Sequence, residues 1–406
     1  MTNMSIGIIG LGSIGSNLAL NIQKKHDVHV YNRSPEKTHT LVNKSVGIHG
    51  YESVCEMISK MEGPRTIITS LPYGLATDNV VSFLSKTMTP GDTIVDCSNE
   101  YFETSRHRES MCSGRNIKYL GVGISGGIRG ALNGPCLMVG GDKKVYQEHQ
   151  KFFESFAVNV THMSTDPGSG HFTKMVHNGI EYGMLQAMSD VFAYCNQDQK
   201  IMKSVLRSVR GTDIDGYLTN YGDDVIDSYH IHTISDVADM NNTGKWCSKL
   251  AIDYAIPTPT IDASVNARTA SRFRKAIDTK QASNVFLDES LAVDALRFAF
   301  AASMLEGYDL VNTQNIKRKK VTKAWSRGTL IECDLVEKNL YEIMDETAMS
   351  TRIFVMHCVH TSIPCPAIQA ALTNYDFTHQ RRTSINYLMA QRHYFGNHSL
   401  TQLHEQ

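Results

Sequence analysis

The chain has 406 residues, of which 41% are hydrophobic and 20% are charged, and its formal net charge at pH 7 is −1. This length suffices for two or three domains with a large buried core, and the balanced charge argues against a role on nucleic acid or on a membrane surface. No apolar stretch approaches the ~20 residues that span a bilayer, and the N-terminus lacks the features of a signal peptide. Nine cysteines without a C-x-x-C pair indicate reduced thiols in a cytoplasmic compartment, and no pattern predicts a metal site.

The first segment of the chain predicts a nucleotide-binding turn. Met4–Ile9 is a short, β-branched apolar run, and the motif GLGSIG follows it before a helical pattern and a second strand at Val28–Tyr31. In such a G-x-G-x-x-G turn, glycines let backbone N–H groups approach a pyrophosphate at a helix N-terminus. The βαβ context favours a dinucleotide site over a glycine-rich turn that binds nothing. The expected coenzyme contacts are Gly10, Leu11, Gly12, Ser13, Ile14 and Gly15.

The end of the second predicted strand indicates which coenzyme the turn would take. A site specific for NAD usually has an acidic side chain there, which binds the ribose 2′-hydroxyl. This chain has Asn32-Arg33-Ser34 instead, so that a guanidinium and a hydroxyl are available for a 2′-phosphate. We therefore predict NADP as the coenzyme; the alternative interpretation of Arg33 is a solvated loop arginine.

Further predicted strands continue the α/β pattern until the chain changes character near residue 170. The strands are Thr66–Leu71, Thr93–Asp96, Lys118–Gly121 and Cys136–Val139. The small residues of 121–127 follow one of them, at the sheet edge where such folds bind ligands. The stretch DPGSG at 166–170 then marks a boundary, and the rest has helical periodicity, around 171–195, 201–210, 245–255, 288–314 and 335–362. The sequence predicts an α/β Rossmann-type dinucleotide-binding domain followed by a large all-α domain.

Residues 174–182, KMVHNGIEY, place five polar side chains on one face of a predicted helix. At 3.6 residues per turn these side chains form one stripe, and the opposite face is mostly apolar. An ordinary amphipathic helix with a solvated side is the alternative interpretation. The five residues are Lys174, His177, Asn178, Glu181 and Tyr182.

Several segments in the same order carry a family pattern. They are GLGSIGSNLALN, NRS, GVGISGGIRGALNGPCLMVGG and GSGHFTKMVHNGIEYG, with later landmarks NTGKW at 242–246, Ala267-Arg268, Trp325–Gly328 and AQRHYFGNH at 390–398. In these segments, collinear from Ile6 to about His398, the chain resembles the 6-phosphogluconate dehydrogenase family. The resemblance implies an NADP-binding domain at 1–170, an all-helical substrate and dimerisation domain at 171–380, and a tail at 381–406 that reaches the partner subunit of a homodimer.

Family roles are carried over position by position. The resemblance implies that Lys174 is the proton acceptor of the reaction and Glu181 the proton donor. The implied substrate contacts are Asn99, Ser125, Gly126, Gly127, His177, Asn178, Tyr182, Thr243, Arg268, Arg392 and His398. Arg392 and His398 would come from the second subunit. The implied coenzyme contacts, besides the glycine turn and Asn32-Arg33-Ser34, are Leu71, Pro72, Tyr73 and Asn99.

The implied reaction gives the polar stripe a purpose. Oxidising a β-hydroxy acid needs a base for the 3-hydroxyl proton, and a lysine serves if its surroundings lower its pKa toward neutrality. The 3-keto acid then loses CO₂, and the resulting enediol must be protonated at C1. Glu181 lies about 10 Å from Lys174 along the axis by helix rise, so the two long side chains would address opposite ends of a short sugar acid.

The chain departs from the family pattern at several contacts. Asn241 stands where the family usually has a lysine near the substrate phosphate, and Ile128 replaces an acid in the Ser-Gly-Gly loop. Leu71-Pro72-Tyr73 replaces a Val-Lys-Ala stretch and loses a cation, and the tail after His398 is shorter than in relatives. The catalytic positions are intact, so the departures fit either a divergent true enzyme or a relative adapted to a similar acid.

The predicted function is NADP-dependent oxidative decarboxylation of 6-phospho-D-gluconate to D-ribulose 5-phosphate and CO₂, a step of the pentose phosphate pathway. Two alternatives stay open. One is a related β-hydroxyacid dehydrogenase that acts on another sugar acid, which Asn241 favours. The other is a non-catalytic NADP-binding paralogue, against which the intact Lys174 and Glu181 speak. The expected partners are the sugar acid and a second copy of the chain.

Overall fold

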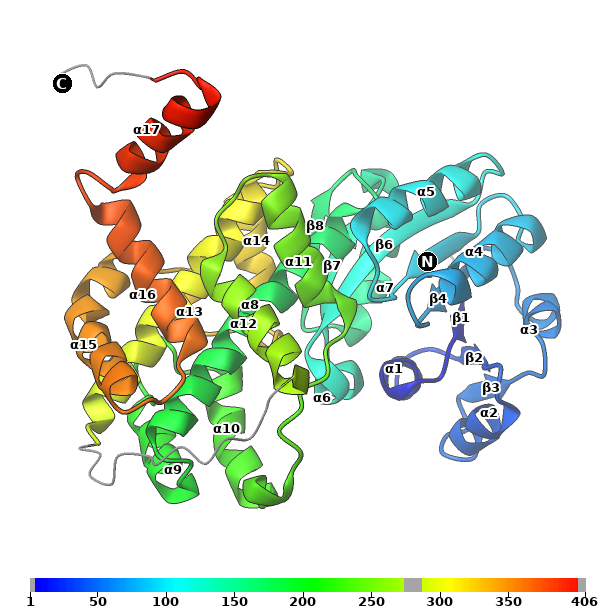
Figure 1. The fold of residues 1–406 in the computed structure, drawn as a ribbon. Helices are drawn as coiled ribbons and strands as arrows, with labels where there is room; N and C mark the ends of the chain where they lie inside the picture. The colour runs from blue at the N-terminus through cyan, green and yellow to red at the C-terminus, as the bar shows by residue number, and fades with distance from the viewer. Residues whose placement is uncertain (1–3, 274–286, 401–406) are drawn as a thin grey trace.

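The computed structural model describes residues 4–273 and 287–400, and Figure 1 shows a sheet at one side of the molecule and a group of helices at the other. The sheet has eight strands in the order β3-β2-β1-β4-β5-β6-β7-β8. Neighbouring strands run parallel, except that β7 is antiparallel to β6. The strands are β1 Ser5–Ile9, β2 Val28–Tyr31, β3 Ile48–Gly50, β4 Arg65–Thr69, β5 Thr93–Asp96, β6 Lys118–Ser125, β7 Cys136–Gly140 and β8 Asn159–Ser164.

The helices of the N-terminal part alternate with these strands. They are α1 Ser13–Ile22, α2 Pro35–Val42, α3 Val54–Lys60, α4 Leu75–Thr87, α5 Phe102–Ser113, α6 Gly127–Asn133 and α7 Lys143–Phe156. The central strands are buried on both faces, as their runs of apolar β-branched residues require. This alternation is the α/β arrangement that the glycine motif and its neighbouring strands predict.

Two strands of the sheet are not recognisable as strands in the sequence. β3 has three residues and ends in a glycine, and β8 reads NVTHMS, in which polar residues interrupt the apolar ones. β6 also continues past its predicted end at Gly121 through Gly123 to Ser125. A Cβ on Gly123 would lie 2.4 Å from the Cβ of Lys174, so the glycine allows a helix to cross this strand closely. Local propensity predicts that the strand ends near such a glycine. The close packing of α8 on β6 explains why Gly123 lies inside the strand instead.

The C-terminal part is helical throughout the residues that the structure describes. Its α-helices are α8 Ser169–Tyr194, α9 Gln199–Ser208, α10 Tyr217–Ser228, α11 Asn242–Asp253, α12 Pro259–Ala270, α13 Glu289–Asn312, α14 Arg318–Trp325, α15 Leu340–His360, α16 Pro366–His379 and α17 Ile385–Gly396, with short 3₁₀ turns at Ile231–Thr233, Ser271–Phe273 and Asp334–Val336. α8 and α13 bury residues on nearly all sides and pack against each other at the centre of this part. The helix predictions correspond to α8, α9, α11, α13 and α15, whereas α10, α12, α14, α16 and α17 were not predicted.

Two of the unpredicted helices begin in the same way. α12 begins at Pro259 within IPTPTI (256–261), and α16 begins at Pro366 within IPCPAI (363–368), so each has a proline as its first residue. The Glu306 carboxylate accepts hydrogen bonds from the N–H groups of Thr260 (2.9 Å) and Ile261 (3.0 Å). At the start of α16, the Asp190 carboxylate accepts hydrogen bonds from the N–H groups of Ala367 (2.9 Å) and Ile368 (3.1 Å). A buried carboxylate from a central helix thus satisfies the free N–H groups at each helix start.

The last helix stands apart from the rest. α17 extends away from the body beyond α16 (Figure 1), and none of its residues is buried. Part of the predicted tail, residues 401–406, lies outside the described residues. Within the described ranges, no helix combines the length and the apolar composition that crossing a bilayer requires.

Candidate active site

The glycine turn between β1 and α1 has the shape of a phosphate cradle. Gly10 has φ +99°, and a Cβ at this position would lie 2.3 Å from the carbonyl oxygen of Ser70. A Cβ on Gly15 would lie 1.9 Å from the carbonyl oxygen of Gly10, so the turn closes tightly on itself. A Cβ on Gly12 would meet nothing within 4 Å, which leaves open space in front of the helix N-terminus. These residues fit the pyrophosphate of a dinucleotide.

The residues after β2 lie beside this turn. The Oδ1 atom of Asn32 accepts a hydrogen bond from the N–H of Leu11 at 2.9 Å, and its amide donates to the carbonyl of Ser34 at 3.1 Å. Asn32 therefore ties the glycine turn to the segment that carries Arg33. The side chains of Arg33 and Ser34 are exposed next to it, where they are free to meet a 2′-phosphate.

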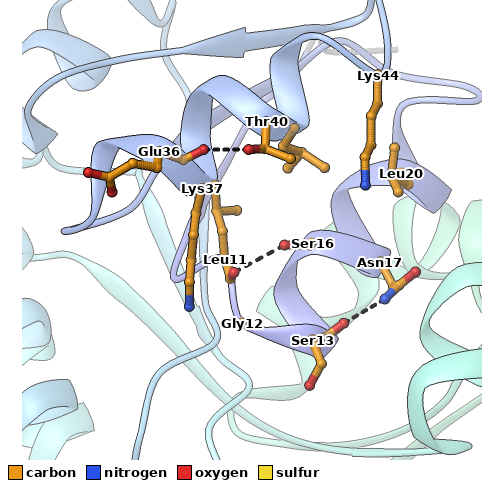
Figure 2. A pocket seen from close by; sticks show the side chains of 11 residues that line it. Leu11, Gly12, Ser13, Ser16, Asn17, Leu20, Glu36, Lys37, Thr40 and Lys44 are labelled. Atoms are coloured by element: carbon orange, nitrogen blue, oxygen red, sulfur yellow. Dashed lines mark hydrogen bonds between the residues drawn. The ribbon is translucent and has the colours of Figure 1, made fainter.

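A hollow of about 390 Å³ lies between α1 and α2, with the glycine turn on its rim. Figure 2 shows the side chains of Lys37 and Lys44 extending toward it from the α2 side, opposite Ser16 and Asn17 of α1. Sequence reasoning missed these lysines. The signal that would have found Lys37 is its position four residues after Arg33, in the first turn of the helix that follows.

Three further predicted segments end strands at the same edge of the sheet. Leu71-Pro72-Tyr73 follows β4, Asn99 follows β5 with its side chain exposed, and Ser125-Gly126-Gly127 ends β6 and begins α6. Gly126 has φ +108°, and a Cβ there would lie 3.0 Å from the carbonyl oxygen of Gly328. The edge therefore gathers the segments that sequence reasoning assigned to coenzyme and substrate.

A buried arginine that the sequence did not single out joins two of these loops. Arg108 of α5 is fully buried and donates to Asp96 (2.8 Å), to Glu100 (2.7 Å) and to Asp78 (2.7 Å). The same Oε2 atom of Glu100 accepts from the N–H of Gly74 at 2.9 Å. The loop after β4 and the loop that carries Asn99 are thus fixed to each other through one carboxylate.

The polar stripe of α8 faces this edge of the sheet and is mostly buried. The Nζ atom of Lys174 lies 3.3 Å from Nδ1 of His177, and Nε2 of the same ring lies 3.0 Å from Oγ of Ser125. The Oε2 atom of Glu181 lies 3.8 Å from the same Nδ1 atom of His177. The histidine ring therefore stands between the lysine, the glutamate and the end of β6.

Burial moves the pKa values of the two predicted catalytic groups toward neutrality from opposite sides. It lowers the pKa of Lys174, although the charge of Glu181 opposes the shift. It raises the pKa of Glu181, although Lys174 and Arg268 oppose that shift. Burial and the neighbouring Lys174 hold the pKa of His177 well below its usual value. A neutral lysine can accept a proton near pH 7, a protonated glutamate can donate one, and the histidine stays neutral.

The far end of the stripe contacts the first turn of α11 and the last turn of α12. The amide of Asn178 donates to Oγ1 of Thr243 at 3.0 Å, and the hydroxyl of Tyr182 donates to Oδ1 of Asn241 at 3.3 Å. Oδ1 of Asn241 also accepts from the hydroxyl and from the N–H of Thr243, so this residue caps α11. The guanidinium of Arg268 lies over the Tyr182 ring, 3.6 Å from its centroid. The structure thus brings together the predicted phosphate contacts of this chain.

The two remaining predicted contacts lie elsewhere in the chain. Arg392 is on α17 and His398 follows it, and both are exposed. Among the described residues, the guanidinium of Arg392 contacts only Met389 of its own helix, at 3.8 Å, and the carbonyl of His398 lies 2.7 Å from the ring of His393. Figure 1 shows α17 on the opposite side of the helical part from the sheet, so a single chain does not bring these side chains to Lys174.

Comparison with protein families assigns both parts of the chain. The family model of the NAD binding domain of 6-phosphogluconate dehydrogenase matches residues 5–164. The family model of the 6-phosphogluconate dehydrogenase C-terminal domain matches residues 170–406. The two matches meet between the end of β8 and the start of α8.

Similar proteins agree along nearly the full length. A Bacillus subtilis protein, the NAD(+)-dependent, decarboxylating 6-phosphogluconate dehydrogenase, is 30% identical, with 97% of this chain and 96% of that protein covered. The decarboxylating enzyme of Klebsiella pneumoniae is 29% identical over 98% of this chain and 97% of its own length. The solved 6-phosphogluconate dehydrogenase of Plasmodium falciparum, determined apo, with its cofactor NADP+ and with its substrate 6-phosphogluconate, superimposes with a TM-score of 0.86 at 27% identity and covers 99% of this chain and 98% of that one.

These findings confirm the predicted family, the α/β domain followed by a helical domain, and the assignment to the nicotinamide-dependent oxidoreductases. The glycine turn lies within the first match, and the buried Lys174 and the partly buried Glu181 of α8 lie within the second. The chain belongs to the 6-phosphogluconate dehydrogenase family.

Proposed function

We propose that the chain catalyses the NADP-dependent oxidative decarboxylation of 6-phospho-D-gluconate to D-ribulose 5-phosphate and CO₂, with Lys174 as the base and Glu181 as the acid. The observation that carries the proposal is the placement of these two groups on one face of α8, both close to Nδ1 of His177, whose Nε2 meets Ser125 at the end of β6. The pKa of the lysine is lowered and that of the glutamate is raised. These are the directions in which the pKa values of a base and an acid must shift to act near neutral pH.

The side chains divide the work along the helix. Lys174 removes the proton of the substrate 3-hydroxyl. NADP held at the glycine turn would supply the acceptor for the hydride that leaves C3. His177 and Asn178 hold hydroxyl and carboxylate oxygens between the two ends, and Ser125 keeps the histidine ring in place. After CO₂ leaves, Glu181 delivers a proton to C1 of the enediol. The side chains of Lys174 and His177 are themselves buried away from bulk water.

The coenzyme proposal rests on Arg33. The glycine turn and Asn32 fit a dinucleotide, and the segment after β2 offers cationic and hydroxyl groups but no carboxylate at 32–34. Lys37, which extends toward the adjoining hollow, adds a second cation nearby. The named relatives include both an NAD(+)-dependent enzyme and one determined with NADP+. The preference for NADP therefore rests on the side chains of this chain and not on its relatives.

The tail supports a homodimer with shared sites. α17 exposes the large apolar side chains of Tyr387, Tyr394 and Phe395 and buries none of its residues. A further exposed apolar stripe, Met349, Ile353, Met356 and Val359, runs along α15 at helical spacing. A second copy of the chain would cover such surfaces and, through α17, deliver Arg392 and His398 to its partner's site.

The free thiols of all nine cysteines support a reducing, cytoplasmic location.

A second candidate function is favoured by Asn241. This neutral residue caps α11 and binds Tyr182 and Thr243 where the family pattern has a lysine, so a related β-hydroxyacid dehydrogenase with weaker demand for a phosphate is the alternative. The remaining alternative is a paralogue that binds NADP without turnover.

The deciding experiment follows NADPH or NADH absorbance with folded protein, using 6-phosphogluconate and its unphosphorylated counterpart gluconate, each with NADP and with NAD. Turnover that requires the phosphate and prefers NADP supports the proposal. Preference for an unphosphorylated acid supports the second candidate. NADP binding without turnover on any acid supports the non-catalytic alternative.

A further inference from the structure

Three aromatic rings from different segments meet where the α/β part contacts the helical part. Trp246 of α11 has its ring centroid 5.4 Å from that of Tyr73, at an interplanar angle of 86°, and 5.7 Å from that of Tyr101, at 59°. Tyr73 lies in the loop after β4, and Tyr101 follows Asn99 in the loop after β5. The Tyr73–Trp246 pair is an edge contact and the Tyr101–Trp246 pair is tilted, and both separations lie in the favourable range for aromatic rings. We call these three residues the aromatic clasp.

On one side, the clasp is attached to loops that border the coenzyme turn. Tyr73 is the last residue of the 71–73 segment, and Asn99 lies two positions before Tyr101. The Glu100 carboxylate accepts hydrogen bonds from the N–H groups of Gly74 and Tyr101, at 2.9 and 3.0 Å. The two loops are therefore linked, and a molecule that orders one of them also orders the other.

On the other side, the clasp is attached to the start of α11. Trp246 and Thr243 are three positions apart and so lie on adjacent parts of the helix surface. A Cβ on Gly244 would lie 2.4 Å from the ring of Tyr182, so the backbone of this turn packs directly on that ring. Thr243 also accepts from Asn178 of α8. A movement of Trp246 therefore moves residues that line the proposed phosphate subsite.

We propose that Trp246 is a positioning residue that couples coenzyme binding to the substrate-phosphate subsite, and that Tyr73 and Tyr101 transmit the coupling. The inference deepens the proposed function and rests on it for the identity of the substrate. Coenzyme contacts to 71–73 and Asn99 order the two loops, and the loops then hold Trp246 and the first turn of α11. Because coupling between two sites is reciprocal, the substrate strengthens coenzyme binding by the same factor.

Two pairs of variants isolate the clasp. Tyr73→Leu removes the ring but keeps an apolar side chain, and its matched control, Tyr73→Phe, keeps the ring. Trp246→Leu and Trp246→Phe form the corresponding pair on α11. Tyr73 is half-exposed and Trp246 only partly buried, so we expect all four proteins to fold, which thermal unfolding checks.

The first measurement is the dissociation constant of 6-phosphogluconate, by calorimetry, without coenzyme and with saturating NADPH, which cannot oxidise the substrate. We expect NADPH to tighten binding about fivefold in the unaltered protein, the small end of coupling between distinct sites. The two Phe variants should keep this ratio, and the two Leu variants should bring it close to one. A Leu variant that keeps the full ratio, or an unaltered protein without one, overturns the inference.

The second measurement needs no substrate. Trp246 and Trp325 are the two tryptophans of the chain, and Trp325 is fully buried, so quenching of fluorescence by acrylamide reports on Trp246. We expect NADP+ alone to reduce quenching in the unaltered protein and in Tyr73→Phe, but not in Tyr73→Leu. If 6-phosphogluconate does not bind at all, the proposed function fails. The quenching measurement still tests whether coenzyme binding reaches Trp246 through the aromatic clasp. An unaltered protein whose quenching ignores NADP+ overturns it.

Discussion

The two ends of the α8 stripe are built differently. At the reaction end, Lys174 and His177 are buried, and their positions follow from the close crossing of α8 over β6 at Gly123. At the phosphate end, Arg268 is only partly buried and Asn241 is exposed at a helix start. The first end is fixed by backbone packing within one chain. The second depends on side chains at helix ends and, by our proposal, on a second chain, so it can change without disturbing the chemistry.

The largest expected effect comes from removing the base. Lys174→Ala should lower kcat by about 10²- to 10⁴-fold, the usual contribution of a general base, and should leave NADP binding nearly unchanged. Steady-state assays and coenzyme titration measure the two quantities. The control is Lys319→Ala on the exposed side of α14, which should retain full activity. Loss of coenzyme binding in Lys174→Ala would mean that the residue supports the fold rather than the reaction.

The pH dependence of the rate tests the same end of the stripe. Burial lowers the pKa of Lys174, so the rate should fall on the acid side as this amine gains its proton. Burial raises the pKa of Glu181, so the rate should fall on the alkaline side as this carboxyl loses its proton. The profile of kcat against pH should be bell-shaped. Glu181→Gln should be slow and should lack the alkaline limb; a variant that keeps this limb would assign it to another group.

Arg33, the exposed cation of the coenzyme site, should resemble the phosphate end of the stripe. Its loss should weaken coenzyme binding and leave the catalysed reaction intact. Arg33→Ala removes a charge-assisted phosphate contact of roughly 1.5–3 kcal/mol, so the KM for NADP should rise about ten- to hundredfold while that for NAD changes little. Paired titrations with both coenzymes measure this. An equal loss for NADP and NAD would show that Arg33 does not bind the 2′-phosphate.

The tail should strengthen the phosphate end across subunits. Arg392→Ala should raise the KM for 6-phosphogluconate at least tenfold, since a charge-assisted bond of about 1.5–3 kcal/mol is lost, and leave NADP affinity nearly unchanged. Mixing this variant with Lys174→Ala protein should restore part of the activity, because one site of the mixed dimer regains both groups. Subunit exchange must be shown independently, for example by differently tagged chains. Inactive mixed dimers would contradict a shared site.

The smallest expected effect comes from adding charge to the phosphate end. Asn241→Lys places an ammonium beside Tyr182 and Thr243 and should lower the KM for 6-phosphogluconate by about threefold to tenfold, in the range of one exposed or partly buried charge contact. The kcat should stay within about twofold, since no group at the reaction end changes. Asn241→Gln controls for the loss of the cap. A large fall in kcat would show that the two ends are not independent.

The sequence predicted the parts of the site that local patterns determine. The glycine turn is specified by its spacing, and the stripe of α8 by helical periodicity. Arg108 was out of reach because its partners, Asp78, Asp96 and Glu100, are brought together only by the sheet. The contact between Tyr73 and Trp246 likewise joins residues far apart in the chain.

The missed helices have local reasons. α12 and α16 begin within Pro-containing stretches that suggest loops, and the carboxylates that satisfy their first N–H groups come from other helices. α17 has apolar residues on several sides and no partner within the described chain. The positions of Arg392 and His398 therefore remain a prediction from the family resemblance.

The two carboxylates that cap α12 and α16 link folding to proton binding. Burial raises the pKa of Glu306 to about 8 and that of Asp190 to about 7, even though each accepts two N–H hydrogen bonds. The folded chain therefore holds these protons more tightly than the unfolded chain, in which a carboxyl titrates near pH 4. Their contribution to the free energy of unfolding is fully present below that pH, declines steadily as the pH rises from there, and is lost once the pH has passed about 7 and 8. The helical domain therefore becomes less stable in alkali, because ionising these buried carboxyls costs more in lost hydration than their N–H bonds return.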